Sequence, residues 1–335
     1  MSRERRWVVG PGGETAAGVV ARLGDDPARA VAEGRVFAGR RRVSDPTESL
    51  AAGEIVFVYG QRGGTKAVAG DLVVLGDDEG VLAAIKPAEL STIADHHGRS
   101  ASLHDRLAQA LGVSASTLHP TSRLDVGVSG VVLFARDEAA RRRLARARDE
   151  GTYRRRYVAI AAGLLAAPRA RWAAPIGRGA DPRRRYARGK DAAEASTDAF
   201  VLGHAGQRAT LLGLSPHTGR THQLRVHSAD AGHPLFGDAL YAGPRRIVKP
   251  SGEVLELGRV ALHALSVVVP DASGRPRRYV APLPNAFDAW WSALGGDAAL
   301  CEGLRQGGDG GDGGDGGDGG DGGDGGDGGD GGDDW

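Results

Sequence analysis

Residues 122–135 read SRLDVGVSGVVLFA and give the clearest structural signal in the chain. The run from Val131 to Ala135 predicts a buried strand, because five apolar residues follow one another without a charge. Asp125 stands in the Gly-containing segment just before this strand. Taken alone, an Asp in such a segment is usually a turn residue, so its meaning depends on the rest of the chain.

Charge is distributed unevenly along the sequence. The 335 residues contain 43 Lys and Arg and 42 Asp and Glu, but ten of the Asp lie between Gln306 and Trp335, where no basic residue occurs. The remainder has a net charge of about +11, carried mostly by Arg. A basic body suggests a polyanionic partner, nucleic acid first. A coding bias toward Arg is the alternative explanation.

The C-terminal segment repeats Gly-Gly-Asp nine times. The repeat offers no apolar surface to bury, and Gly loses the most entropy on ordering. We therefore expect residues 297–335 to form a disordered tail. It either competes with RNA for the basic surface or, as the simpler interpretation, only solubilises the chain.

Other composition features concern membranes, metals and the compartment. No run of about 18 apolar residues and no signal peptide is visible, so we expect no membrane span. The single Cys301 excludes an intramolecular disulfide and a Cys-based zinc site, and the His residues do not follow a metal-binding pattern. These features predict a cytoplasmic protein without a metal.

The first 60 residues read as a small α+β module. Helices are expected at Ala17–Leu23 and Pro27–Ala32, and strands near Val36–Ala38 and Glu54–Val58, with the basic triplet Arg40–Arg42 between the strands. This order resembles the alpha-L RNA-binding module of ribosomal proteins and RNA-modifying enzymes. Any small α+β subdomain with a basic loop is the alternative.

The region after Leu72 alternates strand-like runs with turns. Strands are expected at Leu72–Leu75, Val81–Ile85, Gly130–Ala135, Tyr157–Ala161, Ala209–Leu214, Gln223–His227 and Ala264–Val269. Helices are expected at Leu103–Leu111 and Glu138–Arg148. Many strands with few helices predict an α+β domain built on a mixed, largely antiparallel sheet.

Motifs far downstream of Asp125 change its interpretation. RRYVA occupies residues 155–159, TGRTHQLRVH residues 218–227, GHPLFGDALY residues 232–241 and LHA residues 262–264. In order and spacing, these motifs together with RLD resemble those of the RluA-type pseudouridine synthases. The resemblance covers about residues 72–294. It implies the catalytic fold of that family and the isomerisation of uridine in RNA.

The resemblance also implies residue roles. Asp125 matches the catalytic aspartate, Tyr157 the tyrosine that stacks on the target uracil, and Arg225 the arginine that pairs with the aspartate. Arg123 is expected to hold RNA or the flipped nucleotide. Further RNA contacts are expected from Arg40, Arg41, Arg42, Arg220, His222 and Arg183, the last in a variable insert where the family often places an RNA-contacting loop.

These roles suit the chemistry. Pseudouridine formation breaks the glycosidic bond, turns the base and rejoins carbon 5 of uracil to the ribose, so no cofactor is required. The Asp125 carboxylate would assist departure of the base by attacking the sugar, by attacking the base, or by removing a ribose proton. A neighbouring guanidinium such as Arg225 would favour its ionised form. Stacking on Tyr157 would offset part of the cost of flipping the nucleotide.

The chain departs from the family pattern close to Asp125. Ser122 stands where the family usually has His, Val128 where it has Thr, and Arg155 where it has Lys. An early Asn-Lys-Pro-x-Gly motif appears as Ile85–Glu89, without its Asn and Gly. These departures leave the substrate open.

The expected organisation is a module at 1–60, a linker at 61–71, a catalytic domain at 72–296 and a tail at 297–335. We expect a monomeric enzyme that acts on ribosomal RNA rather than transfer RNA. A catalytically silent RNA-binding protein of the same fold is the alternative function. A nucleic-acid hydrolase is a third possible function, but the sequence lacks the paired carboxylates or metal ligands that would supply a second catalytic group.

Overall fold

The computed structural model describes residues 5–32, 35–39, 41–58, 67–68, 72–94, 102–249 and 251–306. The predictions for Arg40, for most of the linker at 61–71 and for the Gly-Gly-Asp repeat lie outside these residues. No helix in the described ranges is long and apolar enough to cross a membrane.

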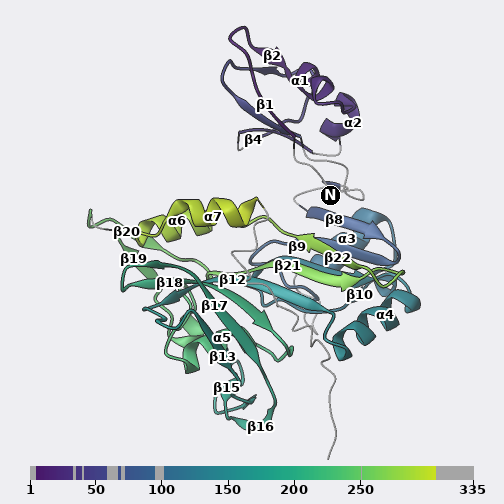
Figure 1. Ribbon diagram of the computed structural model, residues 1–335. Coiled ribbons are helices and arrows are strands. Elements are labelled where there is room, and N and C mark those ends of the chain that lie inside the picture. Colours follow the sequence, from purple (N-terminus) through teal and green to yellow (C-terminus); the bar gives the residue numbers. More distant parts are fainter. Residues whose placement is uncertain are drawn as a thin grey trace, which may run out of the picture.

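The N-terminal module is a small sheet covered on one side by helices (Figure 1). Its elements are β1 (Arg5–Val8), β2 (Glu14–Thr15), α1 (Ala16–Arg22), α2 (Pro27–Ala32), β3 (Val36–Ala38), β4 (Arg41–Arg42), β5 (Ser49–Leu50) and β6 (Ile55–Val58). The sheet order is β1-β6-β3-β4. Val19 and Val20 of α1 are fully buried against Val36 and Val56 of the sheet, so the module has its own apolar core.

A large sheet forms the centre of the region that follows the N-terminal module. It is built from β7 (Ala67–Val68), β8 (Leu72–Asp78), β9 (Val81–Lys86), β10 (His119–Pro120), β11 (Ser129–Ala135), β12 (Arg154–Ala162), β13 (Arg169–Trp172), β17 (Thr197–Ala205), β18 (Ala209–Pro216), β21 (Leu262–Pro270) and β22 (Pro276–Val280). The order is β13-β17-β18-β12-β21-β11-β9-β8-β7, with β10 and β22 paired to β11 and β21. β11 and β21 run parallel and the other described pairs run antiparallel. The predicted mixed, largely antiparallel α+β fold is confirmed.

Helices and smaller elements surround this sheet. They are α3 (Leu103–Leu111), η1 (Ala115–Thr117), α4 (Glu138–Asp149), the insert β14 (Ile176–Arg178), β15 (Tyr186–Ala187) and β16 (Lys190–Ala193), α5 (Gln223–Asp230), η2 (Ala239–Tyr241), the hairpin β19 (Arg246–Val248) and β20 (Val254–Glu256), α6 (Asn285–Ala293) and α7 (Ala298–Arg305). The α3 bounds match the prediction, because Ser102 caps its first turn and Gly112, with φ +66°, ends it.

Alternating side chains of the central strands serve two different cores. Val158, Ile160 and Leu211 pack with the aromatic residues of α6. Tyr157 and Leu212 point the other way and share a core with Leu124, Leu224 and α3. Figure 1 shows α6 and α7 above this part of the sheet and α5 below it. The period of two along β12 therefore directs Tyr157 to the side of the sheet that carries Asp125.

Two sequence predictions were wrong. Residues 223–227 were expected to form a strand but belong to the helix α5. Gln223, Leu224, Val226, His227 and Ser228 are all buried. A helix covered on most sides lacks the one-sided apolar pattern that identifies a helix, so its alternating Leu and Val resembled a strand.

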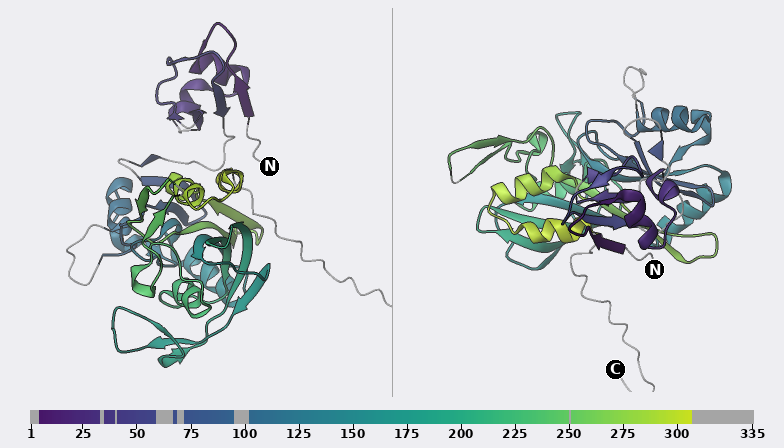
Figure 2. Two further views of the ribbon diagram at one scale, coloured as in Figure 1. Left: turned by 90° about the vertical axis from the view of Figure 1, so that its left-hand side faces the viewer. Right: turned by 90° about the horizontal axis from the view of Figure 1, so that it is seen from above.

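The expected tail begins too early. Residues 298–305 form α7, which lies beside α6 (Figure 2). The Asp297 side chain caps its first turn, and Cys301 and Leu304 are buried in the same core as Trp291. The ordered domain therefore extends at least to Gln306.

Candidate active site

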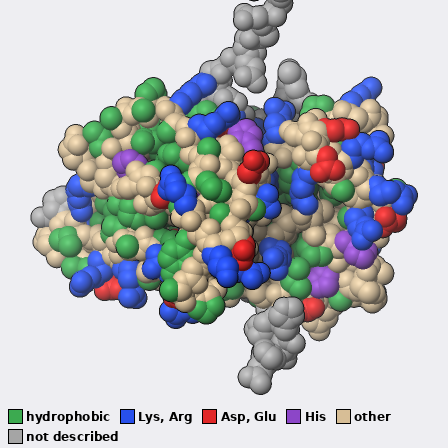
Figure 3. Space-filling model, turned by 90° about the horizontal axis from the view of Figure 1, so that it is seen from below, with side chains coloured by type: hydrophobic (Ala, Val, Ile, Leu, Met, Phe, Trp, Pro, Cys, Tyr) green, Lys and Arg blue, Asp and Glu red, His purple; other side chains and the backbone are tan. Residues whose placement is uncertain are grey.

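A cavity of about 1150 Å³ lies between the Asp125 segment and the ends of β12, β17 and β18. Its lining includes three acidic side chains, Asp125, Asp149 and Asp198. The arginines that line it are Arg123, Arg148, Arg154, Arg155, Arg156, Arg169, Arg171, Arg220, Arg225 and Arg278. The face of the molecule seen from below carries many Lys and Arg side chains beside a central hollow (Figure 3). This charge pattern suits a polyanion.

Hydrogen bonds to the backbone of Leu124 and Val126 fix the loop on both sides of Asp125. Thr92 Oγ1 accepts from Leu124 N at 3.0 Å and donates to Leu124 O at 3.1 Å. On the other side, Val126 O accepts from Glu89 N at 2.7 Å and from Lys86 Nζ at 3.2 Å. The position of the Asp125 carboxylate is thus set by the strand β9 and the loop that follows it.

The loop enters β11 through Gly130, a position that only a glycine can occupy. Its φ is +124°, and a Cβ placed there would lie 2.2 Å from the carbonyl oxygen of Ala264 on the parallel strand β21. Any other residue would push β11 and β21 apart, because the obstructing atoms are backbone. The close pairing of these two strands places the Asp125 loop over the centre of the sheet.

Arg225 joins two carboxylates. Its Nη1 donates to Oδ2 of Asp125 at 2.8 Å, and its Nε and Nη2 donate to the two oxygens of Asp238 at 2.6 and 2.8 Å. The Asp238 side chain is 1 % exposed and that of Asp125 is 27 % exposed. Burial opposes the charge of Arg225, but the hydrogen bonds and charge of Asp238, and then Asp125, outweigh it and raise its pKa. The bidentate pair with Asp238 therefore orients the guanidinium toward Asp125.

His222 lies next to the same carboxylate. Its Nε2 is 3.7 Å from Oδ2 of Asp125, and its Nδ1 is 2.8 Å from the hydroxyl of Tyr241. The Tyr241 oxygen also accepts from Arg185 N at 2.9 Å, so its own proton is available for Nδ1. This pattern assigns the tautomer with the proton on Nε2. Burial lowers the pKa of His222, which keeps the ring neutral near pH 7.

The backbone at His222 is unusual for a non-glycine residue. Its φ is +58°, in the left-handed region, immediately before α5 begins. Such a conformation costs about 1–3 kcal/mol and persists where surrounding contacts hold it, often at functional sites. Here the Tyr241 hydroxyl supplies that contact.

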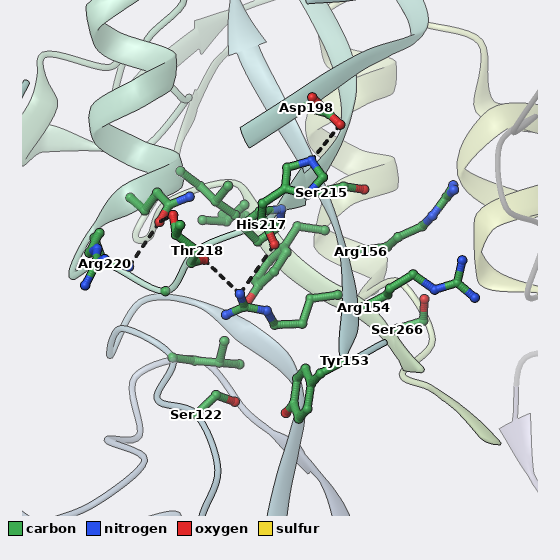
Figure 4. Close-up of a pocket in the computed structure, with 18 of the residues that line it drawn as sticks. Ser122, Tyr153, Arg154, Arg156, Asp198, Ser215, His217, Thr218, Arg220 and Ser266 are labelled. Atoms are coloured by element: carbon green, nitrogen blue, oxygen red, sulfur yellow. Dashed lines mark hydrogen bonds and ion pairs between the residues drawn. The ribbon is translucent and has the colours of Figure 1, made fainter. Parts of the chain in front are cut away.

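Tyr157 and Arg155 form the wall of the cavity on β12. Tyr157 is 8 % exposed, and burial raises the pKa of its hydroxyl. Arg155 Nη2 donates to the carbonyl oxygen of Thr218 at 2.8 Å, so it holds the loop that precedes α5. Figure 4 shows this side of the cavity, with Thr218 and Arg220 on the loop and the His217–Asp198 pair beside it. An arginine at position 155 thus reaches across to the segment that carries His222.

Comparisons with known proteins agree with this geometry. Residues 81–230 match the family described as RNA pseudouridylate synthase. The chain is 37 % identical over 219 residues to the uncharacterized RNA pseudouridine synthase YjbO of Bacillus subtilis, covering 64 % of this chain and 73 % of that one. The chain belongs to the RNA pseudouridine synthase family. It is an isomerase that forms pseudouridine in RNA, of the RluA type.

Two further relatives and one solved structure are also similar to this synthase. It is 31 % identical to the dual-specificity RNA pseudouridine synthase RluA of Yersinia pestis, covering 59 % of this chain and 92 % of that one. It is 33 % identical to ribosomal large subunit pseudouridine synthase D of Nitrosomonas europaea, covering 67 % and 65 %. The human RNA pseudouridylate synthase domain containing 4 has a TM-score of 0.52 and 23 % identity over 66 % of this chain and 92 % of that one, which shows a shared fold.

The predicted site residues of the synthase fall into two groups. Asp125, Tyr157 and Arg225 line one cavity, together with Arg123, Arg220 and His222. Arg123 is exposed, whereas Arg220 Nε donates to the carbonyl oxygen of Glu194 at 2.9 Å.

The remaining predicted RNA contacts lie elsewhere in the synthase. Arg183 is on the loop between β14 and β15, where it pairs with Asp181 at 2.8 Å, and it does not line the cavity. Arg41 and Arg42 do not form one patch, because consecutive residues of β4 face opposite sides of the sheet. The Arg41 guanidinium pairs with Glu48.

Three residues at the site were missed as functional residues, although each stands in a quoted motif. Asp238 and Tyr241 both belong to GHPLFGDALY, and Lys86 precedes Pro87. Lys86 is fully buried and donates to the carbonyl oxygens of Leu90 at 2.6 Å and Val126 at 3.2 Å. Burial lowers the pKa of its amine to about 8. A buried carboxylate that pairs with an arginine elsewhere in the chain leaves no local signal beyond the motif itself.

Proposed function

We propose that this synthase uses Asp125 as its catalytic carboxylate and acts on uridines of large-subunit ribosomal RNA. The observation that carries the catalytic part is the Arg225 guanidinium held between Asp125 and the buried Asp238. Because Arg225 occupies Oδ2 of Asp125, Oδ1 is left for the substrate; no partner of Oδ1 occurs in the described part of the chain.

The reaction needs little beyond a fixed carboxylate and a closed pocket. The bond between N1 of uracil and C1′ of ribose breaks, the base turns, and a bond forms between C5 and C1′. C5 then loses its proton and N1 gains one, so no proton is gained or lost overall. Atoms and electrons balance without a cofactor. Asp125 assists the departure of the base, and the hydrogen bond from Arg225 Nη1 fixes the orientation of its carboxylate.

The other residues of the cavity have binding roles. The target nucleotide leaves its stack at a cost of a few kcal/mol, and stacking on Tyr157 offsets part of that cost. Neutral His222 offers the proton on Nε2 to Asp125 or to an oxygen of the bound nucleotide. Arg123, an exposed residue of the cavity lining, holds the RNA beside the flipped base.

The proposal for large-subunit ribosomal RNA rests on relatives. Two proteins similar to this chain are named ribosomal large subunit pseudouridine synthase D, from Nitrosomonas europaea and Vibrio cholerae.

The module at residues 1–60 would add RNA affinity, and the ordered catalytic domain would span residue 72 to Gln306. The protein would act as a cytoplasmic monomer.

Pseudouridine mapping tests the substrate. Ribosomal and transfer RNA are isolated from cells with and without this chain, and every pseudouridine is mapped. We expect at least one large-subunit position to lose its modification while all transfer RNA positions stay modified. Loss confined to transfer RNA would overturn the substrate assignment and leave the catalytic assignment untouched.

A further inference from the structure

The outer face of the N-terminal sheet carries an ordered row of four side chains, one from each strand. Arg6 on β1 is paired with Phe57 on β6, Phe57 with Phe37 on β3, and Phe37 with Arg42 on β4. Residues paired directly across strands point to the same side of a sheet and lie about 5 Å apart. The row therefore reads Arg-Phe-Phe-Arg across the full width of the sheet.

The opposite face of this sheet is occupied by the module's core. Val36, Ala38, Val56 and Val58 alternate with the row residues along β3 and β6 and are at most 3 % exposed. Arg22 of α1 lies over the ring of Trp7, so the helices cover that side. The row thus faces away from α1 and α2.

The row residues are accessible. Phe37 and Phe57 are partly exposed, and Arg6 and Arg42 are exposed. Beside the row, Val8 and Ile55 form a directly paired apolar contact, 58 % and 43 % exposed. Two aromatic rings, two guanidinium groups and an apolar pair therefore share one face without a helix over them among the described residues.

This combination fits unpaired RNA. Aromatic rings on an open sheet stack nucleobases regardless of sequence, and arginines contact the phosphates between the bases. The row carries positive charge at both ends and no acidic residue, so it complements a polyanion. Duplex RNA hides its base faces and cannot use the rings.

We propose that the Arg6–Phe57–Phe37–Arg42 row is a binding platform for single-stranded RNA next to the modified uridine. The platform rests on the proposed role of the N-terminal module in RNA binding. It is distinct from the cavity that contains Asp125, and it would select sites where unpaired nucleotides flank the target.

The test measures binding of the full chain to a fluorescent oligouridylate and to a duplex RNA of equal length. Phe37→Leu/Phe57→Leu keeps apolar packing but removes both rings, so single-strand affinity should fall about tenfold while duplex affinity stays unchanged. Arg6→Gln/Arg42→Gln should lower the slope of log affinity against log salt by about 1.4, which is about 0.7 for each phosphate that the chain no longer neutralises. Arg22→Gln, on α1 where the guanidinium pairs with Glu14, is the control on the opposite side of the module.

A second measurement does not depend on variants that fold. Oligouridylate containing 4-thiouridine is crosslinked to the wild-type chain, and we expect crosslinks within residues 35–39 or 55–58. Unchanged single-strand affinity in the Phe variants would overturn the platform, and so would crosslinks confined to the cavity. In either case, continued pseudouridine formation would show that the enzymatic assignment stands. Equal losses of affinity for duplex and single-stranded RNA in the Phe variants would also overturn the platform, because they would indicate a purely electrostatic surface.

Discussion

Arg225 Nη1 donates a 2.8 Å hydrogen bond to Oδ2 of Asp125, although the two residues are 100 positions apart in the sequence. The helix α5 supplies the arginine and the loop before β11 supplies the aspartate. Asp238 fixes the other edge of the guanidinium, so the orientation of the Asp125 carboxylate depends on a third, buried residue.

Arg225→Gln should damage both stability and turnover. The change leaves the 1 % exposed Asp238 without its cation, which costs about 3–5 kcal/mol of unfolding free energy. Urea denaturation and single-turnover kinetics measure the two effects. In Arg225→Gln/Asp238→Asn the buried charge is gone, so stability should largely return while turnover stays low. A single variant with wild-type stability and turnover would refute the bridging role.

Tyr241→Phe should slow turnover more than it weakens RNA binding. The variant removes the hydroxyl shared by Arg185 N and His222 Nδ1, so His222 no longer has a fixed tautomer. We expect kcat to fall about tenfold with KM nearly unchanged, and a loss of about 1 kcal/mol of stability. Tyr186→Phe is the control, because Tyr186 lies on β15, next to Arg185, and its hydroxyl is 3.4 Å from Asp181 N. Equal effects of both variants would mean that Tyr241 has only a structural role.

His263 should make the fold sensitive to acid. Its Nε2 donates to the carbonyl oxygen of Ala281, its Nδ1 lies 2.9 Å from Ser129 Oγ, and burial lowers its pKa to about 4. Because the pKa in the unfolded chain is near 6.5, stability is full above pH 6.5 and falls as the pH drops toward 4. The loss is about 3 kcal/mol, from the shift in pKa.

Urea denaturation at pH 7, 5.5 and 4 measures this slope. His263→Asn should flatten it, whereas His217→Asn, half exposed beside Asp198, should leave it unchanged. A wild-type slope in the His263 variant would show that other groups cause the acid sensitivity.

Ending the chain at two positions tests the limit of the catalytic domain. A chain that ends after Gln306 should melt like the full chain. One that ends after Gly296 loses α7 with its buried Cys301 and Leu304, which should cost about 3–5 kcal/mol. Thermal denaturation measures the melting temperatures of both truncated chains and of the full chain. If both melt at the same temperature, α7 contributes nothing to the fold.

The sequence predicted the parts of the fold whose signals are local. Ser102 and Gly112 mark the ends of α3, and the uninterrupted apolar run before Arg136 marks β11. α5 could not be recognised in the same way, because burial on most of its sides erases the helical pattern. Leu300, Cys301 and Leu304 of α7 were hidden by their proximity to the Gly-Gly-Asp repeat, whose composition dominated the interpretation.

The candidate site was predictable only where motifs carry it. Asp125, Tyr157 and Arg225 meet in one cavity, as the motif order implied. The bridge through Asp238 and the Arg185–Tyr241–His222 chain depend on contacts between segments far apart, which spacing does not encode. Arg183 was assigned from its place in an insert, but it pairs with Asp181 away from the cavity.

The most direct test of the catalytic account compares wild type with Asp125→Asn. Purified proteins are incubated with unmodified large-subunit ribosomal RNA under single-turnover conditions, and pseudouridine is quantified by mass spectrometry. We predict that Asp125→Asn binds the RNA with unchanged affinity and forms pseudouridine at least about 10³-fold more slowly. Pseudouridine formation at the wild-type rate in this variant would contradict the assignment of Asp125 as the catalytic carboxylate.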